Sequence, residues 1–192
     1  MALTVKTAPT GTPITLAEAK EHLNVDSGDD DVYIATLIQV ATDQFETDTS
    51  RALVDRTYFL DLEKYPAGDT IELQMPPLES VSSLKQFSTG GVTSTVSAST
   101  YGVDTSSEPG RMVLEASKSW PSDTLRSYNG VRVEYVAGYG TASSVPELAK
   151  NGIKILIGSM YAERERAVTG TIRTSIPTYD NIVWAMKVVN FP

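Results

Sequence analysis

The hydrophobic pattern of the chain changes its period twice. Residues 29–57 place apolar side chains at the three- and four-residue spacing of an amphipathic helix. Three aspartates open this segment, and carboxylates are favourable where the first backbone N–H groups of a helix are unpaired. The segment therefore predicts a long helix with one face against a core. Its apolar positions are Ile34, Leu37, Ile38, Ala41, Phe45, Ala52 and Leu53.

Two shorter segments precede this helix. Residues 1–13 contain Pro9, Gly11 and Pro13 among threonines, which predicts an extended or mobile arm. Thr15 and Glu18 have the spacing of a capping box, in which each side chain accepts a backbone hydrogen bond from the other residue. A short helix is expected to follow, ending near residue 23.

From Tyr58 the apolar positions recur at every second residue, as in half-buried strands. Residues 58–63 and 71–75 flank a turn with proline and glycine, which predicts a hairpin. Further short alternating segments are separated by Ser, Gly, Pro and Asn clusters up to residue 136. Together they predict a small antiparallel sandwich or barrel of about seven strands.

Helical spacing returns after Gly140. A helix is predicted from Ser144 to about Arg166, apolar on nearly every side and therefore the core partner of the long helix. A last helix is expected from about residue 177 to about residue 189. The prediction is an α+β fold, with a helical core of three to four helices and an inserted β unit. The corresponding divisions are residues 1–56, 57–137 and 138–192.

Composition narrows the chemistry. The 192 residues include no cysteine and one histidine, His22, so thiolate zinc sites and thiol nucleophiles are excluded and no metal or cofactor is expected. No stretch approaches the roughly 20 apolar residues that cross a bilayer. The beginning, MALTVKTAPTGTP, lacks the pattern of a signal peptide, which predicts a protein made and kept in the cytoplasm.

The net charge of −8 argues against a surface that grips phosphate groups. Residues 1–56 hold four Lys and Arg against ten Asp and Glu, a net charge of −6, whereas residues 138–192 hold six against four, a net charge of +2. This polarity fits copies that associate head to tail, and it also fits a solvated surface with no partner.

Motifs for catalysis are sparse. Ser82 and Lys85 match the Ser-x-x-Lys pattern of penicillin-recognising enzymes, but the companion motifs are absent. Glu163 and Glu165 alternate with arginines, which favours a solvated or intersubunit ion-pair network over acid–base catalysis. No enzymatic activity is expected.

Five segments carry a family resemblance. They are ITLAEAKEHL at residues 14–23, the acidic and apolar positions of residues 30–51, PPLESV at 76–81, VRVEYVAGYG at 131–140, and residues 145–148 with Tyr161, Glu163 and Arg164. In this order they resemble the head-to-tail connector, or adaptor, proteins of long-tailed bacteriophages and related gene transfer particles. After Gly170 the chain departs from the family pattern, because Lys187 is the only basic residue that follows the apolar segment around Trp184.

The resemblance implies a structural virion protein without catalysis. It implies a ring, expected to be twelvefold, in the virion neck between the portal protein and a head-completion (stopper) or tail-terminator protein. Double-stranded DNA would pass through the ring without sequence recognition, no membrane would be involved, and assembly would take place in the host cytoplasm.

Three groups of residues are candidates for these contacts. The resemblance points to a C-terminal segment that docks on the portal, and the charged helix end and the acidic face of the long helix are candidates for subunit boundaries and for a DNA-repelling lumen. The portal-docking candidates are Tyr179, Trp184, Lys187 and Phe191. The intersubunit candidates are Tyr161, Glu163, Arg164 and Arg166. The lumen or acidic-face candidates are Asp29, Asp31, Asp43, Glu46 and Asp48.

Two other classes stay open. The β insertion could serve as a carbohydrate- or protein-binding module, and a hydrolase that uses carboxylates is a third interpretation. The binding module requires an exposed aromatic patch, for which the candidates are Tyr58, Tyr65, Tyr101, Trp120 and Tyr128.

Overall fold

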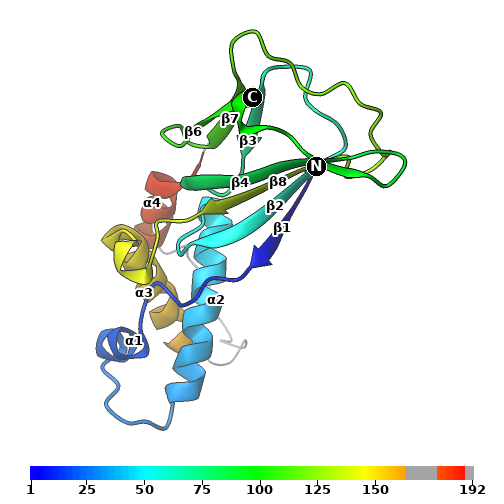
Figure 1. Ribbon diagram of the computed structural model, residues 1–192. Coiled ribbons are helices and arrows are strands. Elements are labelled where there is room, and N and C mark those ends of the chain that lie inside the picture. The colour runs from blue at the N-terminus through cyan, green and yellow to red at the C-terminus, as the bar shows by residue number, and fades with distance from the viewer. Residues whose placement is uncertain (163–176, 189–192) are drawn as a thin grey trace, which may run out of the picture.

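The computed structural model describes residues 1–162 and 177–188, and these residues contain four helices and eight strands. The helices gather at one end of the molecule and most strands at the other (Figure 1). The predicted α+β class is confirmed. Buried side chains form two separate clusters, one among the helices and one between the strands. We call these parts the helical unit and the β unit; the division of the chain at residues 56 and 137 stays a prediction.

The helical unit packs around its longest helix. Ile34, Ala41 and Phe45 of that helix are fully buried, as the apolar spacing predicts. Ile153 of the third helix belongs to the same cluster, so the expected packing of the two long helices is confirmed. The helices are α1 (Leu16–Leu23), α2 (Asp31–Thr49), α3 (Glu147–Ala162) and α4 (Pro177–Met186).

The predicted capping box begins α1. The Thr15 hydroxyl accepts a bond from the Glu18 backbone N–H (3.2 Å), and a Glu18 carboxylate oxygen accepts one from the Thr15 N–H (2.7 Å). These bonds satisfy donors at the helix N-terminus that have no partner inside the helix. The helix ends at Asn24, which adopts the left-handed conformation.

Helix α2 ends before the helical hydrophobic pattern in the sequence ends. α2 ends at Thr49, and Ser50 takes the left-handed conformation with φ of 57°. Beyond it, the Ala52 N–H donates to the carbonyl of Pro76, and Ala52 is buried in the β unit while Leu53 stays in the helical core. Apolar residues continue beyond the end of the helix because Ala52 and Leu53 are each buried in a different core, although neither is helical.

Two antiparallel sheets make up the β unit. The five-stranded sheet has the order β1-β2-β8-β4-β5, and the three-stranded sheet has the order β3-β7-β6. Ile71 and Met112 of the small sheet share one buried cluster with Leu60 and Tyr135 of the large sheet. The strands are β1 (Ala2–Thr7), β2 (Arg56–Leu62), β3 (Thr70–Leu73), β4 (Leu78–Phe87), β5 (Thr93–Thr95), β6 (Tyr101–Asp104), β7 (Gly110–Leu114) and β8 (Val131–Ala137).

The strand pairing corrects two expectations. The predicted hairpin of residues 58–63 and 71–75 is wrong, because β2 pairs with β1 and β8 while β3 pairs with β7 in the other sheet. A closed barrel or a seven-stranded sandwich is not confirmed: the sheets stay open, and residues 2–7 of the N-terminal arm add β1 to the large sheet. Alternation reveals that a segment is a strand, whereas its partner depends on contacts distant in sequence.

Candidate intersubunit and docking surfaces

The described residues provide little for catalysis. Within residues 1–162 and 177–188, no group of three or more His, Asp or Glu side chains could hold a metal ion. No helix in those ranges has the length and apolar character needed to cross a bilayer. Ser82 and Lys85 lie inside strand β4.

Arg51 connects the two units. Its guanidinium donates to both carboxylate oxygens of Glu108 in the loop before β7, one of them at 2.9 Å, and to the hydroxyl of Tyr139 at 3.3 Å. Its Nε donates to the carbonyl of Met186 at the end of α4. The hydrogen bond from Arg51 lowers the pKa of the Glu108 carboxyl. One side chain thus fixes the C-terminal ends of two helices against a loop of the β unit.

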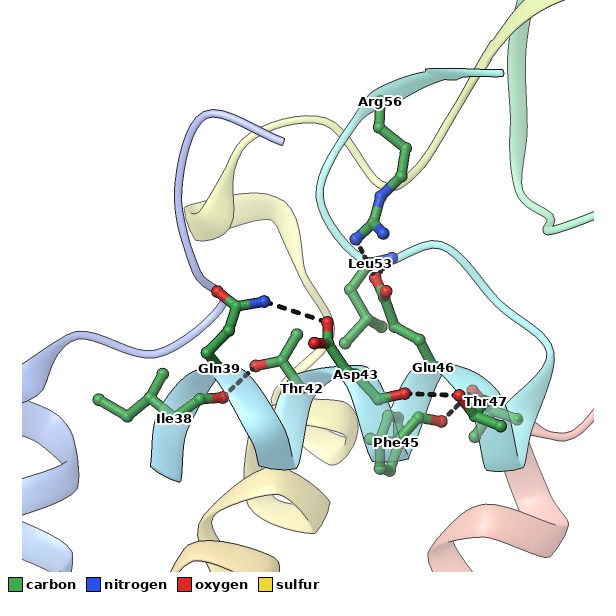
Figure 2. A network of polar contacts seen from close by, with 10 residues as sticks. Ile38, Gln39, Thr42, Asp43, Phe45, Glu46, Thr47, Leu53 and Arg56 are labelled. Atoms are coloured by element: carbon green, nitrogen blue, oxygen red, sulfur yellow. Dashed lines mark hydrogen bonds and ion pairs between the residues drawn. The ribbon is translucent and has the colours of Figure 1, made fainter. Parts of the chain in front are cut away.

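Glu46 forms a second connection, shown in Figure 2. One oxygen of its carboxylate accepts bonds from the Leu53 N–H (2.8 Å) and from Arg56 Nη2 (2.6 Å). The residue is only 4% exposed, and this burial raises its pKa despite the opposing effect of Arg56. Glu46 therefore has to be removed from the predicted acidic face. It is held inward because it pairs with the chain that leaves the helix.

Two more of the five predicted acidic-face carboxylates are only partly exposed. Asp31 is half-buried and pairs with Lys20 of α1 at 2.6 Å. Asp48 is half-buried, and its carboxylate accepts a hydrogen bond from the hydroxyl of Tyr179 at 2.6 Å. Asp29 and Asp43 remain exposed. Whether any of these carboxylates faces a lumen stays a prediction.

Tyr179 is not available as an exposed docking residue. It is 8% exposed, and its ring meets Phe45 edge-on with the centroids 6.2 Å apart. Burial, together with the hydrogen bond to Asp48, raises the pKa of its hydroxyl. Tyr179 holds α4 on α2, because it shares the core-facing side of α4 with Ile182 and Met186. Its role in portal docking stays a prediction.

Trp184 has the opposite orientation. It is 84% exposed in the second half of α4, away from the core-facing side of that helix. Lys187 is also exposed, just beyond the helix end. An indole with this exposure beside an ammonium group resembles the aromatic anchors of protein interfaces. The fourth docking candidate, Phe191, lies outside the described residues.

The intersubunit candidates are described only in part. The Tyr161 hydroxyl donates to Asp30 at 2.6 Å, and its ring lies 6.1 Å from that of Tyr33. These contacts join the end of α3 to the beginning of α2. The other three candidates, Glu163, Arg164 and Arg166, lie outside the described residues.

The aromatic patch required by the binding-module interpretation does not form. Tyr58 is 2% exposed and stacks on Tyr135 in the β core. Tyr65 and Trp120 stack on each other with centroids 5.3 Å apart, and Tyr101 is half-buried. Only Tyr128 of the five candidates is exposed, at 69%. Tyr58, Tyr65, Tyr101 and Trp120 are buried or half-buried in the β unit and do not join Tyr128 in one exposed surface.

A cavity of about 740 Å³ opens beside β3 and the turn that precedes it. Met1 and Val188, close to the ends of the described chain, contribute to its wall with Leu62, Tyr65 and Ile71. Lys64 and Glu72 are its charged lining residues. Thr70 and Gln74 are among its neutral polar lining residues.

The structure reveals residues that the sequence interpretation missed. Arg51 has no local signal for its role, since Glu108 is 57 positions away. The exposure of Val32 and Val40, in contrast, could have been predicted from the helical pattern. They lie on the polar side of the helical pattern, and they are 83% and 46% exposed on α2.

Part of the sequence matches a known protein family. Residues 13–85, which include α1, α2, β2, β3 and most of β4, match the model of the phage gp6-like head-tail connector protein family. No curated protein matches the sequence. The resemblance to head-to-tail connectors is thereby confirmed for this part of the chain.

Solved structures extend the likeness to the whole fold. Chains in the virion of a native gene transfer agent particle (TM-score 0.83, 21% identity) and in the neck of an empty particle computed with C6 symmetry (0.84, 21%) are similar over 100% of this chain and 98% of theirs. A chain in the neck of a native particle computed with C12 symmetry gives a TM-score of 0.81 at 22% identity, with the same coverage. At these identities the likeness establishes the fold.

Proposed function

We propose that this chain is a structural subunit of the neck of a phage-like particle. Twelve copies form a ring between the portal protein and a stopper or tail-terminator protein, after assembly in the host cytoplasm. The observation that carries the proposal is the likeness of the whole chain to a neck protein of a particle solved with C12 symmetry. The connector-family match of residues 13–85 supports it independently.

The charge distribution supports a ring. A ring of identical copies needs two different faces that complement each other. The first 56 residues carry a net charge of −6 and the last 55 a net charge of +2, so a contact between the first segment of one copy and the last segment of its neighbour would be electrostatically favourable.

We further propose that double-stranded DNA passes through the ring without being held. A protein with a net charge of −8 provides few of the clustered cations that bind phosphates. Asp29 and Asp43 are the exposed carboxylates of the predicted set, and Asp29 would repel the DNA backbone if it lined the channel.

The portal contact is assigned to Trp184, Lys187 and Phe191. The test is a double substitution, Trp184→Ala with Phe191→Ala, and we expect loss of portal binding with an unchanged circular dichroism spectrum. Tyr128→Ala is the matched control, because it removes an exposed aromatic side chain from the β unit. Portal binding by the double variant at the wild-type level contradicts this assignment.

Electron microscopy of the protein mixed with its portal tests the function itself. The expected particle is a portal with one additional ring of twelve copies stacked on its axis. Monomers that ignore the portal at saturating concentration contradict the proposal. Glycan binding by the chain under the same conditions would favour the binding-module alternative.

A further inference from the structure

The exposed side of α2 is unusual for a helix in water. Its solvent-facing positions between residues 32 and 47 carry valine, alanine, threonine or glutamine, and one charged residue, Asp43. Val32 is 83% exposed and Val40 is 46% exposed. A solvated helix normally presents mostly charged and polar groups, and a contiguous neutral stripe marks a contact surface. We call this stripe, Val32, Thr36, Val40, Asp43 and Thr47, the α2 outer face.

A second surface of similar character lies on α3. Leu148 is 45% exposed, Asn151 is exposed, and Lys154 and Ile155 are half-buried. Asn151 is three residues from Leu148 and from Lys154 and four from Ile155, so these side chains line the exposed side of the helix around Asn151. The neighbouring Glu147 is already paired with Lys150 at 2.8 Å. We call Leu148, Asn151, Lys154 and Ile155 the α3 outer face.

The two faces point away from each other. α2 and α3 pack through their buried sides, so their exposed sides lie on opposite flanks of the helical unit. Figure 1 shows α2 on one flank, with α1 and much of α3 on the other. Identical copies placed side by side therefore bring the α2 outer face of one copy to the α3 outer face of the next, which is the heterologous contact that closes a ring.

The single charges of the two faces are complementary. Asp43 accepts a bond from the Gln39 amide (3.0 Å) and has no ion pair within residues 1–162 and 177–188. Lys154 likewise has none among the residues described; it lies close enough to Glu18 to help lower the pKa of that carboxyl, which falls mainly because of hydrogen bonds from Thr15. Two Asp43 side chains facing each other would repel, which disfavours a symmetric α2–α2 contact.

We propose that the α2 outer face of each copy packs on the α3 outer face of its neighbour, with the Asp43 carboxylate paired to the Lys154 ammonium. Val, Thr and Asn side chains at the seam allow the two helices to approach closely, and the apolar groups supply the buried area. This inference rests on the proposed ring and specifies which surfaces form it.

A charge exchange tests the pairing. Asp43→Lys and Lys154→Asp should each reduce the fraction of assembled rings about tenfold or more, since each places like charges in a packed contact. The double variant, Asp43→Lys with Lys154→Asp, should recover most of the rings. Asp69→Lys and Lys118→Asp are matched controls at exposed sites of the β unit and should assemble normally.

The outcomes separate the inference from the function. Single variants that assemble like wild type, or a double variant no better than its parents, overturn the assignment of these faces while the ring itself stands. A wild-type protein that forms no ring with its portal overturns the proposed function.

Disulfide trapping gives an independent test, because the chain has no cysteine of its own. The double variant Val40→Cys with Leu148→Cys should form a ladder of covalent oligomers under oxidation. A mixture of the two single variants should give only heterodimers. Homodimers of Val40→Cys, or no cross-link up to the solubility limit, overturn the proposed contact.

Discussion

The two units of this protein use their polar residues differently. In the β unit, charged side chains pair between strands of the large sheet: Arg132 on β8 donates to both oxygens of Asp61 on the neighbouring β2, at 2.7 and 2.9 Å, and Lys6 on β1 pairs with Glu134 on β8, two strands away. Arg132 also lies 4.5 Å from the ring centre of Phe59. In the helical unit, charged groups near the core are paired, while the outer faces of α2 and α3 carry one unpaired charge each among the residues described.

This difference indicates which unit presents surfaces to partners. Cross-strand ion pairs join charged groups of the β unit to each other, whereas the outer faces of α2 and α3 expose Val32, Val40 and Leu148 to solvent and α4 exposes Trp184.

The largest loss is expected at the junction. Glu46→Ala leaves Arg56 without its carboxylate and the Leu53 N–H without an acceptor in a buried site. Removing one partner of a buried ion pair costs about 3–5 kcal/mol of unfolding free energy. Urea denaturation measures it. Asp43→Ala on the exposed side of the same helix is the control and should change stability by less than about 0.5 kcal/mol.

The two cores can be compared through one glycine each. A Cβ on Gly110 would lie 2.4 Å from Cβ of Leu78 in the β core, and one on Gly152 would lie 2.5 Å from the Phe45 ring in the helical core. Each alanine substitution should lower the free energy of unfolding by about 1–3 kcal/mol. The loss should be larger for Gly110→Ala than for Gly152→Ala, because the Leu78 Cβ atom cannot rotate away as the Phe45 ring can.

The control for this pair is Gly158→Ala on α3, where the nearest atom would be 3.5 Å away. That substitution should be neutral or stabilise the helix by about 0.5–1 kcal/mol. A loss at Gly158 equal to that at Gly152 would mean that close packing is not the cause.

A smaller, pH-dependent effect is expected at Glu108. Its pKa is lowered from 4.5 in the folded state, so its pairing with Arg51 stabilises the protein above that pH and the stabilisation is lost as the pH falls through the folded-state pKa. Glu108→Gln should therefore be less stable than wild type at pH 7, by about 1 kcal/mol or less because the carboxylate is half-exposed. The difference should vanish in acid. Thermal melts across pH 3–7, a range of about four units around the unperturbed carboxyl pKa, would reveal it.

The opposite sign is expected at Glu46. Burial raises its pKa, so the folded state retains that proton to a higher pH than the unfolded state does. Stability attributable to this group should therefore increase as the pH falls through the interval just above 4.5. A Glu46→Gln variant should not show that increase.

The smallest effect is expected at Trp184. Because the side chain is 84% exposed, Trp184→Ala should change the free energy of unfolding by less than about 0.5 kcal/mol. Phe45→Ala, at a fully buried aromatic residue of the same unit, should cost about 3–5 kcal/mol. A large loss of stability for Trp184→Ala would show that the indole packs within its own chain.

The sequence predicted the positions of helices and strands better than it predicted which strands pair with each other. Helical spacing and the Thr15–Glu18 capping box located α1, α2 and the buried faces, because these signals come from residues three or four positions apart. The hairpin was predicted wrongly, since the pairing of β3 with β7 depends on the packing of the two sheets.

The candidate site shows the same division. Trp184 was recognised as a bulky residue near the C-terminus, but its pattern could not distinguish an exposed anchor from a core residue. Glu46 and Tyr179 fit an exposed role by residue type, yet the structure buries both. Their partners, Arg56 and Asp48, were present in the sequence without any spacing that would pair them.

Most helices and strands in their order, although not β1, could be predicted from the sequence, as could the absence of thiol chemistry and the unequal charge of the two ends, because these follow from composition and from local periodicity. The tertiary structure alone decided which carboxylates remain exposed, which strands pair, and that α2 and α3 turn neutral faces in opposite directions. The physical reason is that burial and pairing depend on contacts between residues far apart in the chain, such as Arg51 with Glu108, and local periodicity carries no information about such contacts.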